Sequence, residues 1–70
     1  MRLVHRGLYN YIDHIYDNLF IISLKTGEEM LLECIEEGSI CFIFRLLNRC
    51  IDFHANEYIC VRYEDIDIEV

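Results

Sequence analysis

The sequence predicts an α+β protein that is mostly β, with an N-terminal helix followed by a five- to six-stranded antiparallel meander that closes as a small barrel. Three observations support this prediction. Apolar residues recur at helical spacing as far as Asn18, the spacing then changes to the alternation of strands, and residues 58–70 read as strand, turn and closing strand. We expect one domain over residues 1–70, with the helix in 1–18 and the barrel in 19–70.

The helix is predicted at about residues 3–17. Its expected buried face carries apolar residues at helical spacing, namely Leu8, Tyr11, Ile12, Ile15, Tyr16 and Leu19. Leu3 and Val4 extend this face by one turn, and Asn18 is a residue type that commonly ends a helix. His5 and His14 are then expected at the surface.

Residues 19–35 are expected to form a hairpin around the loop Lys25-Thr26-Gly27. A three-residue loop with Gly27 in the left-handed conformation pairs Ile22 with Met30 and Phe20 with Leu32. This register gathers one apolar face from Phe20, Ile22, Leu24, Met30, Leu32 and Cys34. A two-residue loop would instead mix acidic side chains into that face, because side chains alternate along a strand.

The remaining residues predict further short strands in meander order. The nearly continuous apolar run from Ile40 to Leu47 indicates a central strand that is covered on both faces. Residues 50–54 and 58–63 are expected to pair as a hairpin around Ala55-Asn56-Glu57. Glu64-Asp65 then forms a corner before a closing strand at residues 66–70.

Two short motifs resemble those of the small-barrel group that includes Sm-like and SH3-like proteins. The run Leu24-Lys25-Thr26-Gly27-Glu28-Glu29-Met30 is similar to the group's leucine-turn-glycine start, and Val61-Arg62-Tyr63-Glu64-Asp65-Ile66-Asp67-Ile68 is similar to its closing segment. The resemblance covers most of residues 19–70 and implies a bent antiparallel barrel. Tyr63 stands where the group has glycine, and the group's Asp…Asn base-binding pair has no match around Glu37 and Cys41. The resemblance therefore implies the fold more strongly than RNA binding.

The charge distribution argues against several classes of partner. The formal net charge is −7, and the residue ranges 1–18, 19–56 and 57–70 carry 0, −3 and −4. Nucleic acids and anionic membranes bind cationic surfaces, so direct nucleic-acid binding and membrane association are not expected. No apolar run reaches the ~18 residues of a membrane helix, and no signal-peptide core follows the basic start. We therefore expect a cytoplasmic protein.

The chemistry-bearing side chains predict no enzyme. Four cysteines, at positions 34, 41, 50 and 60, lack the close pairs of zinc sites, and reduced, half-buried thiols are the simplest interpretation. One face of the second hairpin would gather Cys50, Asp52, His54, Tyr58, Cys60 and Arg62, which leaves a metal or catalytic site as the alternative to a polar face. No nucleophile with a positioned base and no glycine-rich phosphate loop can be recognised, so we expect neither catalysis nor a cofactor.

The acidic character favours a non-catalytic protein-interaction module that docks on a basic, nucleic-acid-binding surface of a larger protein. Phage-encoded antagonists of host defence nucleases are similar in size and charge, by analogy of type. The expected partner-binding residues are acids of the closing segment with one arginine and one exposed tyrosine: Glu64, Asp65, Asp67, Glu69, Arg62 and Tyr9. A second set, Glu28, Glu29, Glu33, Glu36 and Glu37, is either a solvated face or a further acidic surface.

Two other functions remain open at this point. One is a self-associating Sm-like ring that binds RNA or a small ligand, for which residues 19–25 or 66–70 would serve as unpaired edge strands of a homo-oligomer. The other is a structural domain that holds a metal ion with some of the four thiols.

Overall fold

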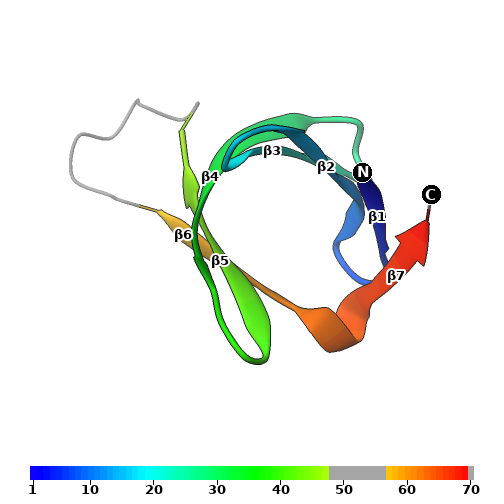
Figure 1. Cartoon of the computed structure of the whole chain (residues 1–70). Coiled ribbons are helices and arrows are strands. Elements are labelled where there is room, and N and C mark those ends of the chain that lie inside the picture. The colour runs from blue at the N-terminus through cyan, green and yellow to red at the C-terminus, as the bar shows by residue number, and fades with distance from the viewer. Residues whose placement is uncertain (48–56, 70) are drawn as a thin grey trace.

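A computed structural model describes residues 1–47 and 57–69, and these residues form one antiparallel sheet of seven strands (Figure 1). The elements are β1 (Arg2–His5), β2 (Tyr9–Tyr16), β3 (Leu19–Leu24), β4 (Glu29–Glu37), β5 (Cys41–Leu46), β6 (Tyr58–Arg62), the 3-10 helix η1 (Tyr63–Asp65) and β7 (Ile66–Glu69). The strand order is β6-β5-β4-β3-β2-β1-β7. Figure 1 shows the sheet wrapped around its own core as a half-barrel, with β7 returning beside β1.

The predicted N-terminal helix is wrong, and with it the α+β class, because residues 3–17 form β1, a loop and β2 and the described residues contain no α-helix. Leu3 and His5 are buried while Val4 between them is less so, which is the alternation of a strand. Leu8 and Ile15, expected on the buried helix face, are 77% and 49% exposed. The β-branched and aromatic residues of this segment favour strands, and Gly7 in its middle disfavours a helix.

Asn18, the predicted end of the helix, instead lies in the turn between β2 and β3. Tyr16 pairs with Leu19, so Asp17 and Asn18 form a two-residue hairpin turn. Asp17 has a φ of 51°, and aspartate is among the few residue types that adopt this left-handed conformation readily.

The predicted hairpin at residues 19–35 is confirmed as β3 and β4. Phe20 pairs with Leu32 and Ile22 with Met30, as the three-residue loop requires. Gly27 has a φ of +96°, its N–H donates to the carbonyl of Leu24, and the Leu24 N–H donates to the carbonyl of Glu28. The apolar face of this hairpin faces the core, because its six residues are either buried or packed against the buried cluster.

The predicted strand, corner and strand at the C-terminus are also confirmed, as β6, η1 and β7. β6 pairs with β5, so that Phe42 lies opposite Val61 and Phe44 opposite Ile59. β7 pairs with β1 at the other end of the sheet, so η1 spans the opening between the two ends (Figure 1). The strand predicted at residues 50–54 lies outside the described residues.

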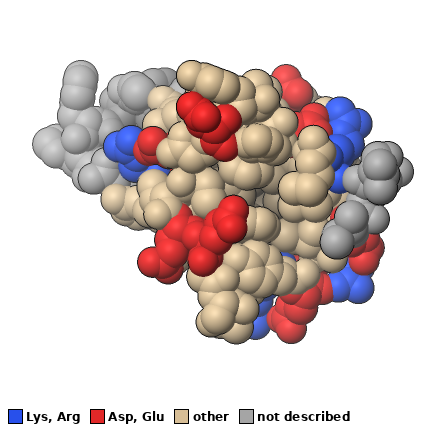
Figure 2. Space-filling model, in the orientation of Figure 1, with Lys and Arg blue, Asp and Glu red and all other residues tan. Residues whose placement is uncertain are grey.

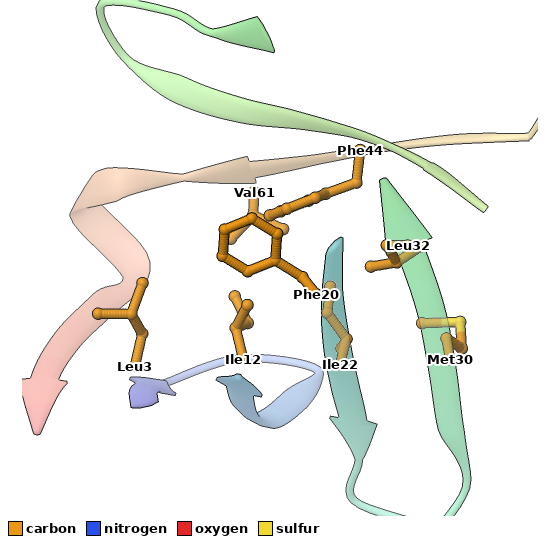
Figure 3. Close-up of a cluster of buried hydrophobic side chains, with 8 residues drawn as sticks. All are labelled: Leu3, Ile12, Phe20, Ile22, Met30, Leu32, Phe44 and Val61. Atoms are coloured by element: carbon orange, nitrogen blue, oxygen red, sulfur yellow. The ribbon is translucent and has the colours of Figure 1, made fainter. Parts of the chain in front are cut away.

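Eight buried apolar side chains from β1 to β6 fill the half-barrel and point toward one another in Figure 3: Leu3, Ile12, Phe20, Ile22, Met30, Leu32, Phe44 and Val61. Phe44 and Phe20 meet edge to face with ring centroids 5.2 Å apart. Phe42 packs beside both rings at the margin of this cluster. Burial of these side chains is the main favourable contribution to folding of a chain this short.

His5 lies at the end of β1 and is only 8% exposed, so the expectation of a surface histidine is wrong. Its Nδ1 accepts hydrogen bonds from the backbone N–H groups of Gly7, at 2.9 Å, and Tyr9, at 3.4 Å. Burial lowers the pKa of His5, and Lys25 and Arg6 lower it further, whereas Asp65 acts in the opposite direction. The β1–β2 loop is therefore held by a neutral imidazole.

Acidification is expected to destabilise the protein through His5. Because the folded pKa lies below the unfolded value near 6.5, the unfolded chain binds the proton more readily. The stabilising contribution of neutral His5 is therefore complete above pH ~6.5 and is lost as the pH falls through the folded pKa. We expect His5→Asn, which keeps a backbone acceptor at this position, to flatten the loss of unfolding free energy between about pH 7.5 and 5 in urea titrations.

The exposed His14 supplies the matched control for this experiment, as His14→Asn. Carboxylates that titrate in the same range are common to all three proteins, so their contribution cancels in the comparison. Equal flattening in both variants would contradict a specific role for His5.

Candidate protein-interaction surface

The acids predicted to bind a partner from the closing segment already meet cations of the same chain. Arg62 Nη1 lies 3.2 Å from Glu64 Oε1, and Arg6 Nη1 lies 3.8 Å from Asp67 Oδ1. All four side chains are more than half exposed, so each pair contributes little to stability. Asp65 is half-buried in η1, and its carbonyl accepts a hydrogen bond from the Arg6 backbone N–H. The local charge of this segment is thus partly neutralised.

The other two residues predicted to bind a partner, Tyr9 and Glu69, are not part of these ion pairs. Tyr9 was expected to be exposed, and this is wrong, because its side chain is half-buried against the core with its ring centroid 4.9 Å from that of His5. Burial raises the pKa of Tyr9. The backbone of Glu69 lies opposite Arg2 in the β1–β7 ladder.

A second acidic group lies at the end of β4, where the strand is irregular. The register between β4 and β5 shifts between Cys34 and Glu36, so that Glu36 faces Ile43 and Glu37 faces Phe42. Such a shift leaves one residue without a partner and bends the strand. The unpaired residue is Ile35, whose side chain is 48% exposed.

The turn from β4 to β5 is held by Tyr63 of η1. The Tyr63 hydroxyl donates to the carbonyl of Gly38 at 2.7 Å, and the Tyr63 backbone N–H donates to the carbonyl of Ile40 at 3.0 Å. Its ring meets Phe42 edge to face with centroids 4.8 Å apart. This packing gives Tyr63 a structural role, and it fixes Ile40 in a position where 67% of the side chain is exposed.

Glu36 and Glu37 make the surroundings of this turn electronegative. Burial raises the pKa of Tyr63, and the carboxylates of Glu37 and Glu36 raise it further. A hydrogen bond with Cys60 raises the pKa of Cys41, burial adds to this effect, and Glu36 raises it again. Within residues 1–47 and 57–69, neither Glu36 nor Glu37 forms an ion pair with a cation.

Two hollows lie in this part of the molecule, and the acids line the first of them. One, of about 430 Å³, is lined by Met1, His14, Phe20 and Ile35 together with Glu36 and Glu37. Another, of about 330 Å³, lies between Met1, Phe42 and Tyr63. On the face that Figure 2 shows, acidic side chains lie in separate groups beside a broad uncharged area.

We call this region the β4–β5 surface and define it by six residues: Met1, Ile35, Glu36, Glu37, Ile40 and Tyr63. It combines unpaired acids with apolar side chains that are strongly exposed. The sequence identified Glu36 and Glu37 as part of an acidic set. It could not identify the register shift at Ile35 or the hydrogen bonds of Tyr63, because both depend on contacts between residues that are distant in the sequence.

The structure describes only some of the residues of the alternative metal or catalytic cluster. Tyr58, Cys60 and Arg62 alternate along the outer face of β6 as predicted, whereas Cys50, Asp52 and His54 lie outside the described residues. In the described part of the chain, no three His, Cys, Asp or Glu side chains gather in a way that could hold a metal ion. No helix in the same residues is long and apolar enough to cross a membrane.

Comparison with known proteins gives no family: the chain matches no protein-family model, and no curated protein and no solved structure is significantly similar to it.

Proposed function

We propose that the chain is a non-catalytic protein-interaction module whose β4–β5 surface docks on a basic surface of a larger protein. The observation that carries the proposal is that Glu36 and Glu37 have no cationic partner in the described chain and lie beside the exposed Ile35 and Ile40. Apolar side chains at the centre of an interface supply affinity, and complementary charge supplies steering and specificity.

The charge of the whole chain favours a partner surface that ordinarily binds nucleic acid. A net charge of −7 on 70 residues resembles the polyanion that such a surface attracts. A small acidic body held there would exclude the nucleic acid, so we propose inhibition by occlusion as the mode of action. This mode requires no catalytic group.

Reversing the charge of the β4–β5 surface is expected to abolish partner capture. In the double variant Glu36→Lys, Glu37→Lys, two repulsive contacts with a basic partner replace two attractive ones, and the affinity should fall at least about tenfold. The measurement is affinity capture from extract of the source cell, followed by mass spectrometry and titration of the captured protein against each variant. Binding by the wild type should weaken as salt rises, because exposed charges are screened.

The matched control carries the same change of charge at the opposite end of the strands, as Glu29→Lys at the start of β4 and Glu57→Lys just before β6. Both residues are exposed, and neither belongs to the β4–β5 surface. The proposal requires the control to bind as the wild type does. If both variants lose the same affinity for the captured protein, the effect is one of net charge and the proposed surface is wrong. Binding of nucleic acid by the pure chain at physiological salt would also contradict the proposal.

Self-association is the second candidate function, and one observation favours it. Among residues 1–47 and 57–69, β6 and β7 stand at the two ends of the strand order, so each has a partner strand on one side only in this part of the chain. β3, which the sequence left as a possible edge, lies between β2 and β4. Capture experiments that recover only further copies of the chain itself would support this candidate over the first.

A further inference from the structure

A hollow of about 430 Å³ lies between Met1, the β2–β3 turn and the end of β4. Backbone hydrogen bonds hold these three segments around it. The Cys34 N–H donates to the carbonyl of Asn18 at 2.7 Å, and the His14 N–H donates to the carbonyl of Met1 at 3.1 Å. The volume falls within the range of ~300–1,000 Å³ that is typical of ligand-binding clefts. The hollow is therefore formed by the chain itself, before any partner binds.

The lining of this hollow combines aromatic and aliphatic surface with acids. Phe20 and His14 form an aromatic wall, with ring centroids 4.9 Å apart. Met1 and Ile35, which are 73% and 48% exposed, add aliphatic surface. The acids in the lining are Asp17, Glu36 and Glu37. No lysine or arginine of the described chain lines the hollow, and none of these acids forms an ion pair within residues 1–47 and 57–69, so negative charge is in excess there.

We propose that this hollow receives an arginine side chain of the basic partner, with the guanidinium beside Glu36 and Glu37 and the aliphatic stem against Ile35. This inference rests on the proposed function, and it specifies the side chain of the partner that enters the β4–β5 surface. A long cationic side chain matches both parts of the lining, because its methylene groups pack on apolar surface while its charged head donates hydrogen bonds to carboxylates. An acidic side chain would be repelled, and a purely apolar one would leave the carboxylates without a partner.

Arginine fits this lining better than lysine for two reasons. A guanidinium is flat and weakly hydrated, so it stacks on aromatic rings such as the exposed ring of His14 and loses little hydration on entering an apolar hollow. It also carries five N–H donors in one plane, which can serve two carboxylates at once, whereas the ammonium of lysine is compact and strongly hydrated. The hollow should therefore select arginine over lysine.

The test titrates the isotope-labelled full chain with N-acetyl-arginine amide and follows the backbone amides by heteronuclear NMR. The amides that shift should be those around the hollow, such as Asp17, Ile35 and Glu37. N-acetyl-citrulline amide has nearly the same shape without the charge, and it should bind at least about tenfold more weakly because its hydrogen bonds are no longer charge-assisted. N-acetyl-lysine amide should also bind more weakly than the arginine probe, as should methylguanidinium, which lacks the aliphatic stem.

The double variant Glu36→Gln, Glu37→Gln keeps the size of both side chains and removes their charge, so its affinity for the arginine probe should fall at least about tenfold. The matched control is Glu29→Gln, Glu57→Gln, in which neither residue lines the hollow, and it should bind the probe as the wild type does. The same spectra report whether each variant is folded, and the comparison of probes on the wild type does not depend on any substitution.

Three results would overturn the inference: equal affinity for the arginine and citrulline probes, equal affinity for the arginine and lysine probes, or no shifts at the hollow. Failure of the inference is distinguishable from failure of the proposed function. If charge reversal at Glu36 and Glu37 abolishes partner capture but the arginine probe shifts no amide around the hollow, the docking surface is supported and the arginine site is wrong.

Discussion

Replacing Phe44 with alanine is expected to lower the free energy of unfolding by about 3–5 kcal/mol. Phe44 is fully buried on β5, and its ring lies 5.2 Å from that of Phe20 and 5.6 Å from that of Phe42. The loss combines the transfer free energy of the ring with the cost of the cavity that it leaves. A domain of this size has a total stability near the low end of about 5–15 kcal/mol, so the variant should be close to unfolded at room temperature.

Urea unfolding followed by far-ultraviolet circular dichroism measures this effect. Phe44→Leu keeps most of the apolar volume and should cost less than about 1.5 kcal/mol, which gives a graded value if the alanine variant does not fold. Tyr58→Ala is the exposed aromatic control on the adjacent strand, where 54% of the side chain is accessible, and it should change stability by only about 0.5 kcal/mol. Similar costs for Phe44→Ala and Tyr58→Ala would show that Phe44 is not at the centre of the core.

The strands from β3 onward could be predicted because their signals are local. The hairpin register follows from Gly27 and from the alternation on either side of it, and the structure has that register. The corner at Glu64-Asp65 is likewise set by adjacent residues and is found as η1. In these segments the apolar pattern, the turn residues and the pairing all indicate the same arrangement.

The prediction of a helix in the N-terminal segment was wrong for a physical reason that cannot be read from the residues of that segment alone. The register of β2 against β3 shifts twice, between Tyr9 and Tyr11 and between His14 and Tyr16, and such shifts break the strict alternation of a strand. Broken alternation over Tyr11, Ile12 and Ile15 coincides with helical spacing. Moreover, one neighbour of β1 is β7, which comes from the opposite end of the sequence. Pairing at that distance is invisible to local periodicity.

The proposed interaction surface could also not be predicted from local sequence alone. The sequence identifies which residues are acidic but not which acids have cationic neighbours. Asp67 meets Arg6 only because β7 lies beside β1, and Glu64 meets Arg62 across the start of η1. Neutralisation of these acids shifts the proposed docking region to Glu36 and Glu37. That assignment required the fold.

Val4→Pro is expected to lower the free energy of unfolding by about 3 kcal/mol or more, and it distinguishes the sheet from the predicted helix. Val4 lies in β1 between two strands, opposite Tyr11 of β2 and Asp67 of β7. Proline removes the backbone N–H from a ladder that is paired on both sides, and its ring disturbs the neighbouring strand. In a helix that began near residue 3, by contrast, proline at residue 4 would occupy the first turn, where its missing N–H costs little.

The matched control for this substitution is Val4→Ala, which removes most of the side chain and keeps the N–H. Val4 is half-buried, so the alanine variant should lose only about 1 kcal/mol, and the difference between the two variants isolates the contribution of the ladder. The measurement is urea unfolding of both variants, with amide hydrogen exchange of β1 and β7 as a second readout. If Val4→Pro costs no more than Val4→Ala, then β1 is not an internal strand and the closure of the half-barrel by β7 is wrong. A large difference with loss of protection in β7 would instead establish that the N-terminal strand holds the two ends of the chain together.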